Sequence, residues 1–288
     1  MKEITFDCSY GSIAGIVWGA GNNNKILALH GWLDNAASFS QLAPLLAKRG
    51  YEVVAIDFAG HGLSAHRAKG HFNHLTDYVL DVQNVLSLLD WQQPILLGHS
   101  MGAAIAHMYA VAYPELVAKL IMIENIGPVP AYKHGTAASD LKKALTQWQK
   151  YTSRHKNYYN NIDEALQARL QVTPMEASCL LPLVSRSLKK TPKGYHWRTD
   201  KRLRLQSMFR FSEDIIQDML AADKPPTQLI LAEPFTYALK YPTVSQRIAK
   251  LNATEYITIK GHHHLHMDQA QQVFSAISVF LTNTSETI

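Results

Sequence analysis

A serine stands between two glycines in the stretch Gly98–Gly102 (GHSMG), which follows an apolar run and precedes an alanine-rich segment. This G-x-S-x-G pattern, placed between a predicted strand and a predicted helix, is typical of a turn that exposes a nucleophilic serine. Gly98 and Gly102 lack a Cβ, so the backbone can bend sharply and present Ser100. The backbone N–H of Met101, at the start of the predicted helix, is then a donor for the oxyanion that serine attack creates.

A serine hydroxyl needs a base at neutral pH, and histidines gather after the last predicted strand. The stretch Gly261–Gln269 (GHHHLHMDQ) contains His262, His263, His264 and His266. Its second half approaches the H-x-H-x-D-H pattern of metal-dependent hydrolases, but Gln269 stands where the final histidine is required. Zinc takes three or four N, O or S ligands, and both cysteines lie far away in the sequence. We therefore expect a base for Ser100 in this stretch, and neither a metal nor another cofactor.

Short apolar runs alternate with helical patterns through most of the chain, and these elements must position the serine and the histidines. Strands are predicted at Glu3–Cys8, Ile13–Trp18, Lys25–Leu29, Glu52–Phe58, Ile95–Leu97, Lys119–Glu124, Thr227–Ala232 and Glu255–Lys260. Helices are predicted at Phe39–Arg49, His74–Asp90, Val244–Leu251 and Asp268–Thr282, and directly after Ser100. Apolar runs without polar alternation are typical of strands buried on both faces of a sheet. The pattern predicts an α/β fold with a doubly wound, mostly parallel sheet.

A second oxyanion donor is expected after the strand Lys25–Leu29, where the chain continues as His30-Gly31-Trp32. Ligands collect at the carboxyl ends of the strands of an open parallel sheet, so this loop is expected to face Ser100. Glycine permits the close backbone approach that an oxyanion donor requires, which makes the Trp32 backbone N–H the candidate. The alternative is that the Trp32 ring only covers the core.

The pattern changes at Gly127-Pro128, after which helical spacing replaces the alternation of strands and helices. Helices are predicted at Lys142–Tyr151, Ile162–Val172, Pro174–Ser187 and Glu213–Leu220, with no clear apolar strand from Thr136 to about Ala222. We interpret residues 128–222 as a helical cap inserted into a core formed by residues 1–127 and 223–288. A cap at this place would cover the catalytic cleft and set the size of the substrate.

The positive charge of the chain is concentrated in this predicted cap. The whole chain carries a formal charge of +5, whereas sixteen Lys or Arg face eight Asp or Glu between Ala131 and Ala222, a local charge of +8. Such a segment attracts anionic substrates, a membrane surface or nucleic acid, or it is simply a solvated helical surface. We favour the solvated surface and expect no nucleic-acid partner.

Length and composition favour a globular protein of the cytoplasm. The 288 residues are 47% hydrophobic, which is enough to bury a substantial core. The two cysteines, Cys8 and Cys179, suggest no disulfide framework and so a reducing compartment. The first residues carry no apolar secretory segment, and no apolar stretch is long enough to span a membrane. We expect a cytoplasmic protein with no membrane span, and the pattern leaves its oligomeric state open.

The chain resembles the α/β-hydrolase family over essentially its whole length. The resemblance depends on His30-Gly31, the turn Asp57–Ser64, the stretch Gly98–Gly102 and a histidine after the last strand. Family members commonly show Gly-x-His-x-x-x-x-acid before the final helix. If Asp268 is the acid of this pattern, the histidine lies five residues before it, so the resemblance implies His263 as the base. His262 and His264 are the neighbouring alternatives.

The acidic member of the expected triad departs from the commonest family pattern. Most relatives have an Asp after the strand that follows the cap, but Leu231–Leu239 (LAEPFTYAL) contains none. Glu233 lies in this stretch, but it comes earlier in the sequence than the Asp of most relatives. A minority of the family takes its acid from the end of the strand before the cap, where this chain has Glu124. The resemblance therefore implies Glu124 as the acid, with Glu233 as the alternative; either is otherwise a loop carboxylate that caps a helix or pairs with an arginine.

Within the family, the chain looks most like the serine hydrolase-like proteins. This resemblance depends on His30–Ala36 (HGWLDNA), Thr199–Arg204 (TDKRLR) and the Gly-x-His-x-x-His-Met form of the histidine loop. It implies an esterase-like hydrolase of small acyl substrates that needs no cofactor. Arg202 and Arg204 would hold a carboxylate or phosphate if they turned inward, but arginines more often brace a cap.

The expected reaction is cleavage of a carboxylic ester through an acyl-enzyme intermediate. Ser100 attacks, His263 accepts its proton, Glu124 orients the imidazole, and the backbone N–H groups of Met101 and Trp32 bind the oxyanion. Hydrolysis of C–C bonds, thioesters or lactones uses the same groups and stays open. A catalytically silent binding protein on the same scaffold is the alternative of a different class.

Overall fold

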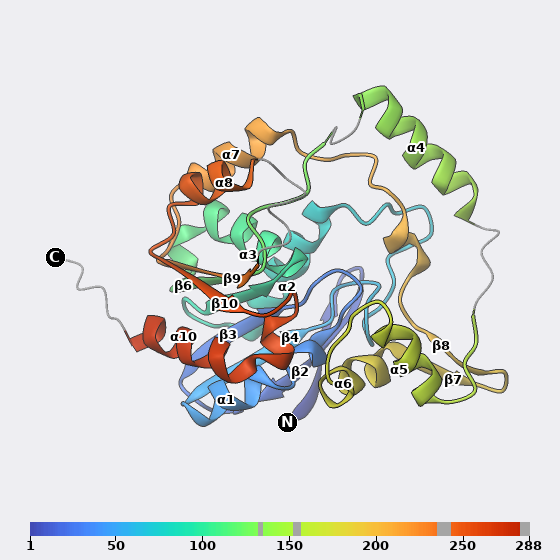
Figure 1. Ribbon diagram of the computed structural model, residues 1–288, viewed down its shortest axis with the longest axis horizontal. Coiled ribbons are helices and arrows are strands. Elements are labelled where there is room, and N and C mark those ends of the chain that lie inside the picture. The colour runs from blue at the N-terminus through green and yellow to red at the C-terminus, as the bar shows by residue number, and fades with distance from the viewer. Residues whose placement is uncertain (132–134, 152–156, 235–242, 283–288) are drawn as a thin grey trace.

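The computed structural model describes residues 1–131, 135–151, 157–234 and 243–282, which fold around an eight-stranded sheet (Figure 1). The strands are β1 (Lys2–Cys8), β2 (Gly11–Trp18), β3 (Asn24–Leu29), β4 (Tyr51–Ile56), β5 (Ile95–His99), β6 (Lys119–Ile123), β9 (Thr227–Glu233) and β10 (Glu255–Lys260). Their order across the sheet is β1-β2-β4-β3-β5-β6-β9-β10. β2 pairs antiparallel with β1 and β4, and the other neighbouring strands are parallel. The expected doubly wound, mostly parallel sheet is confirmed.

Helices cover both faces of this sheet. One face packs against α1 (Leu42–Lys48) and α10 (Ala270–Thr282), and the other against α2 (Leu75–Leu89), α3 (Met101–Ala112) and α8 (Val244–Leu251) (Figure 1). Short helical turns lie at η1 (Ala36–Phe39), η2 (Pro114–Leu116) and α9 (Leu265–Asp268). The expected helix Phe39–Arg49 is thus η1 followed by α1, because the Asn35 side chain accepts the Ala37 N–H and starts a tight turn first.

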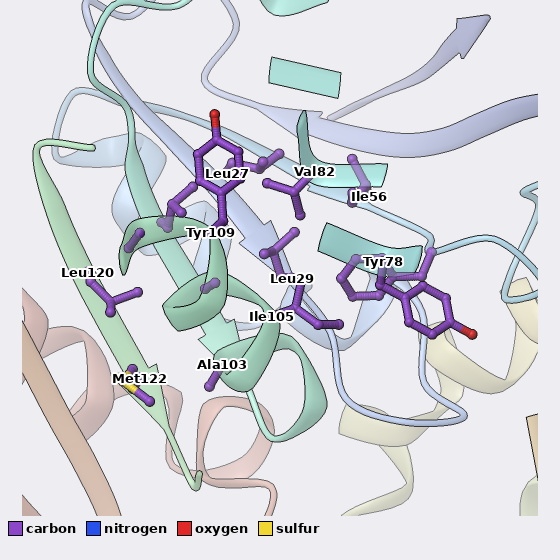
Figure 2. Close-up of a cluster of buried hydrophobic side chains, with 14 of the residues drawn as sticks. Leu27, Leu29, Ile56, Tyr78, Val82, Ala103, Ile105, Tyr109, Leu120 and Met122 are labelled. Atoms are coloured by element: carbon purple, nitrogen blue, oxygen red, sulfur yellow. The ribbon is translucent and has the colours of Figure 1, made fainter. Parts of the chain in front are cut away.

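The strands alternate their side chains between two separate cores, as the pleat of a sheet requires. Leu27 and Leu29 of β3 point to the side of α2 and α3, where Figure 2 shows them beside Val82, Ile105 and Tyr109. The intervening Ile26 and Ala28 pack on the opposite side with α1 and α10. Because both faces are covered, β3 to β6 need an almost continuous apolar sequence, and this made them predictable.

The described residues between β6 and β9 contribute no strand to the main sheet. It contains α4 (Ala137–Gln149), α5 (Ile162–Leu170), α6 (Ala177–Ser187), β7 (Leu188–Thr191), β8 (Gly194–Trp197), η4 (Lys201–Arg204) and α7 (Glu213–Ala221). We call residues 128–222 the insertion; its helices α4, α5 and α6 lie along one side of the molecule, while α7 lies beside α8 (Figure 1).

The hairpin of β7 and β8 adds two short strands to a segment that was expected to be helical and without a clear apolar strand. Each strand is only four residues long, and β7 leaves Lys189 and Lys190 exposed, so the sequence shows no apolar run there. One side of the hairpin packs through Leu188 into a small core formed with α5 and α6. The insertion is therefore mainly helical, with a two-stranded sheet of its own.

Buried polar contacts fasten the insertion to the main sheet. The Arg186 guanidinium of α6 donates from Nε to both carboxylate oxygens of Asp57, at 3.0 and 2.9 Å. The Asn35 Nδ2 donates to the Leu183 carbonyl at 2.9 Å and to Ser187 Oγ at 2.8 Å.

In the part of the chain that the structure describes, no helix is long and apolar enough to cross a membrane.

Candidate active site

Ser100 lies on a strained turn between β5 and α3. Its φ of 51° and ψ of −118° place it outside the regions that L-residues usually adopt, and its N–H donates to the Ile123 carbonyl at 2.9 Å. A Cβ at Gly98 would lie 2.3 Å from the Ala103 Cα, and one at Gly102 would lie 2.0 Å from the Leu29 oxygen. The two glycines are thus required by close backbone packing on both sides of the serine.

A chain of two hydrogen-bond contacts connects Ser100 to a buried carboxylate. The His263 Nε2 lies 3.0 Å from Ser100 Oγ, and its Nδ1 lies 3.1 Å from Glu124 Oε2. With its proton on Nδ1, the imidazole donates to Glu124 and accepts from the serine hydroxyl. The His263 side chain is 39% exposed and that of Glu124 only 2%, so the carboxylate lies beneath the imidazole and away from water.

The position of Glu124 is set by the end of β6. Its N–H donates to the Ile230 carbonyl of β9 at 2.9 Å, and its φ of 58° turns the chain away from the sheet. The carboxylate Oε1 accepts the N–H of Ala232, while Oε2 faces His263. Because both oxygens have a partner, the carboxylate is held in one orientation.

The alternative residues have other partners. Glu233 is exposed at the end of β9, where its carbonyl accepts the Gly261 N–H at 3.2 Å. His262 pairs with Asp268, and the His264 Nε2 lies 3.6 Å from Asp34 Oδ2. Of the segment in which most relatives carry the acid, residues 235–239 lie outside the described residues.

The two candidate oxyanion donors lie at the same cavity as the serine. Met101 is the first residue of α3, so its N–H belongs to the first helical turn, which has no partner within the helix. Trp32 follows β3, and its indole Nε1 donates to the Leu203 carbonyl at 2.9 Å, which fixes this loop against the insertion. Ser100, Met101 and Trp32 all line a cavity of about 520 Å³. That their backbone N–H groups bind an oxyanion stays a prediction.

A buried network behind the histidine loop was missed by the sequence analysis. The His99 Nε2 lies 2.8 Å from the His263 carbonyl oxygen, and Asp34 faces both the His99 Nδ1, at 3.9 Å, and His264. Asp34 also accepts a hydrogen bond from Arg169 Nη2 of α5 at 2.8 Å. His99 directly precedes Ser100 in the sequence, and Asp34 follows Trp32 by two residues. This nearness to predicted site residues was the clue that the sequence offered.

The charges of this network follow from its burial. Burial and then the neighbouring His263 and His264 hold the pKa of His99 well below its usual range, so the ring is neutral. Burial opposes the ionisation of Asp34, but the hydrogen bond from His264 and the charges of His264 and Arg169 outweigh it and lower its pKa. A buried anionic carboxylate therefore connects α5 of the insertion to the loop that carries His263.

Arg202 acts as a brace between the insertion and the core. Its guanidinium donates to the Asp200 carboxylate at 2.6 and 2.9 Å and to the carbonyl oxygens of Arg67 and Ala68 at 2.6 and 2.7 Å. Arg202 and Arg204 also line the cavity. Among the described residues, no group of three His, Cys, Asp or Glu side chains is arranged to hold a metal ion.

Comparison with known proteins shows the family and the fold of this chain. Residues 24–270 match the alpha/beta hydrolase fold family. A "Serine hydrolase-like protein" of Danio rerio is 30% identical over 97% of this chain and 88% of its own length. A crystal structure of a hypothetical protein from Pseudomonas aeruginosa PAO1 superposes with a TM-score of 0.90 and 36% identity, covering 98% of this chain and all of its own. A thioesterase domain from the curacin biosynthetic pathway shares the fold, with a TM-score of 0.83 and 24% identity over 98% of this chain and 99% of its own.

Proposed function

Because the chain belongs to the α/β-hydrolase family, we propose that it is a serine hydrolase that cleaves carboxylic esters of small acyl substrates. The observation that carries the proposal is the alignment of three side chains, with 3.0 Å from Ser100 Oγ to His263 Nε2 and 3.1 Å from His263 Nδ1 to Glu124 Oε2. The strained backbone of Ser100 supports the same conclusion, since such strain gathers at functional sites.

The first half of the reaction forms an acyl-enzyme. His263 Nε2 takes the hydroxyl proton as Ser100 Oγ attacks the ester carbonyl carbon, and the backbone N–H groups of Met101 and Trp32 bind the resulting oxyanion. Glu124 accepts the Nδ1 hydrogen bond and stabilises the imidazolium. When the tetrahedral intermediate collapses, the C–O bond to the alcohol breaks and His263 returns its proton to the departing oxygen.

The second half regenerates the enzyme. A water molecule gives a proton to His263 and attacks the acyl carbon of the ester on Ser100, again through an oxyanion at the same N–H groups. Collapse breaks the bond to Ser100 Oγ, which takes the proton back from His263 and releases the carboxylic acid. The cycle uses water and groups that this chain itself supplies.

In this proposal the insertion, residues 128–222, is a cap over a core formed by residues 1–127 and 223–288. Its contacts with Trp32 and Asp34 support this role, because they fasten the insertion beside the oxyanion loop. We also place the enzyme in the cytoplasm, on the ground that Cys8 and Cys179 are both free thiols. Thioester, lactone and C–C bond hydrolysis would use the same three side chains.

The test is turnover of short p-nitrophenyl esters by the wild-type protein and by Ser100→Ala. We expect the variant to lose essentially all turnover, about a thousand-fold or more, while its circular dichroism and melting temperature match those of the wild type. Equal turnover by the folded variant would refute the mechanism. Parallel assays with thioester and lactone substrates rank those chemistries against simple esters.

A further inference from the structure

The cavity beside Ser100 has a mainly apolar wall with unusual polar groups set into it. Apolar side chains such as Met101, Ala104, Leu203 and Leu205 form much of the wall, and the volume of about 520 Å³ accommodates a small-molecule acyl group. The polar groups include arginines and carboxamides, and the chemistry of these two kinds of group indicates what else the acyl group carries.

The charge of the cavity wall is positive. Arg202, Arg204 and Arg210 line it, and none of the described residues that line it is an Asp or Glu. Arg202 is neutralised by Asp200, at 2.6 Å. Within the described residues, no carboxylate pairs with Arg210, which lies between Phe209 and Phe211 at the cavity. A guanidinium without a carboxylate partner, at the edge of a mainly apolar cavity, attracts an anionic ligand.

Two carboxamides of the wall lack partners. Asn125 is 7% exposed and directly follows Glu124, and its Oδ1 is buried without a hydrogen bond to any described residue. The Oδ1 and Nδ2 atoms of Asn73 are also buried without a hydrogen bond to any described residue. The backbone of Asn73 is left-handed, with a φ of 51°. Both residues line the cavity. Buried polar groups are nearly always paired, so these carboxamides fit a ligand with hydrogen-bonding groups of its own.

We propose that the cavity selects acyl esters whose acyl chain carries a carboxylate at its far end. Arg210 supplies the opposite charge, and the carboxamides of Asn73 and Asn125 orient the polar end of the chain. This inference rests on the proposed serine hydrolase function, since it concerns the substrate of the same site. The net positive charge of the insertion supports it, because it draws anionic substrates toward the cavity.

Three esters of the same alcohol test the proposal. Mono-p-nitrophenyl adipate ends in a carboxylate, p-nitrophenyl hexanoate has the same chain length with an apolar end, and p-nitrophenyl methyl adipate masks the charge. We expect kcat/KM for the adipate to exceed that for the hexanoate by about 10-fold or more, and the preference to shrink in high salt. The methyl adipate should behave like the hexanoate.

Charge-removing variants locate the effect. Arg210→Gln should lower kcat/KM for the adipate by about 10-fold more than kcat/KM for the hexanoate, and Arg210→Lys should keep part of the preference. Arg49→Gln removes the same charge from an exposed position at the end of α1 and should change neither substrate. Equal losses for both substrates in Arg210→Gln, or no adipate preference in the wild type, would overturn the inference.

The two proposals fail in different ways. If Ser100→Ala still hydrolyses the hexanoate, the serine hydrolase function itself is wrong. If the wild type hydrolyses the hexanoate through Ser100 without preferring the adipate, the function stands and only the inference about the carboxylate is lost.

Discussion

The cavity has two walls that are built in different ways. On the sheet side, Ser100 and Glu124 follow adjacent parallel strands, and backbone hydrogen bonds of 2.9 Å to Ile123 and Ile230 fix both residues. On the insertion side, the wall is the irregular segment 203–211, where the Gln206 N–H donates to a side chain, Gln147 Oε1, at 2.7 Å. The sheet side thus holds the chemical groups by backbone geometry, whereas the insertion side is shaped by its side chains.

This difference separates catalysis from substrate selection. Substitutions of Ser100 and Glu124 on the sheet side should change the rate of the chemical step, because in the proposed mechanism these two groups act at the reacting centre. Substitutions on the insertion side should change which substrates bind, with little effect on kcat. The contacts between the two sides should affect stability as well as rate.

The sharpest test on the sheet side compares two glutamates at neighbouring strand ends. Glu124→Gln should lower kcat by about a thousand-fold, because the neutral side chain no longer stabilises the imidazolium or favours the correct tautomer of His263. Glu233→Gln, the matched control on β9, should leave kcat within about 2-fold of the wild type. Steady-state kinetics with p-nitrophenyl butyrate measures both. The reverse ranking would move the acid to Glu233.

The contact between the two sides is tested at Asp34 and Arg169. Asp34→Asn should lower the free energy of unfolding by about 2–3 kcal/mol, because it leaves the Arg169 guanidinium without a charged partner. It should also lower kcat more than it raises KM, since the loop of His263 loses a support. Urea unfolding of Asp34→Asn, Arg169→Leu and the double variant gives the coupling. Strictly additive losses would show that the pair does not connect the two sides.

The burial of His107 in α3, on the sheet side, predicts that the protein loses stability in acid. Burial lowers the pKa of His107 in α3 to about 4, from about 6.5 in an unfolded chain. Between these values the unfolded chain binds a proton that the folded chain excludes, so the free energy of unfolding falls as the pH falls. This contribution is fully present above pH of about 6.5 and amounts to about 1–3 kcal/mol.

A variant isolates the contribution of His107. His107→Leu should flatten the dependence of the unfolding free energy on pH between about 4 and 6.5. Denaturant unfolding at a series of pH values measures the slope. An unchanged slope in His107→Leu would mean that His107 is protonated in the folded protein.

The smallest effect is expected on the insertion side. Phe209 lines the cavity, is 58% exposed and has its ring edge-on to that of Phe211, so Phe209→Ala removes apolar contact with bound substrate and with this one neighbouring ring. KM for a medium-chain ester should rise by about 3-fold with kcat unchanged. Val172→Ala, an exposed apolar residue of the insertion outside the cavity, is the control. A large fall in kcat for Phe209→Ala would mean that the insertion takes part in the chemical step.

The sequence predicted the sheet side well and the insertion side poorly, for a physical reason. Strands buried on both faces and a turn between two obligatory glycines leave a plain pattern, so the position of Ser100 at the end of β5 was predictable. The hairpin of β7 and β8 has one solvent-facing side and short strands, and it left no such pattern. The contacts of Asp34 with Arg169 and His264 join residues far apart in the chain, and no local spacing indicates them.

The sequence left two candidates for the acid, Glu124 and Glu233, for a related reason. Glu124 and Glu233 both end strands in the sequence, and a strand-end position alone does not say which carboxylate reaches the histidine loop. The structure separates them by burial, since Glu124 lies beneath His263 and Glu233 is exposed. This burial favours Glu124, and its role as the acid stays a prediction.

Labelling with a fluorophosphonate probe, followed by mass spectrometry of the digested protein, tests the central claim most directly. The reagent reacts with a serine that an adjacent base activates. We expect one modified peptide, with the adduct on Ser100, and loss of labelling in His263→Ala. Folded wild-type protein that stays unlabelled, or that is labelled at another serine, would contradict the claim that Ser100 is the nucleophile.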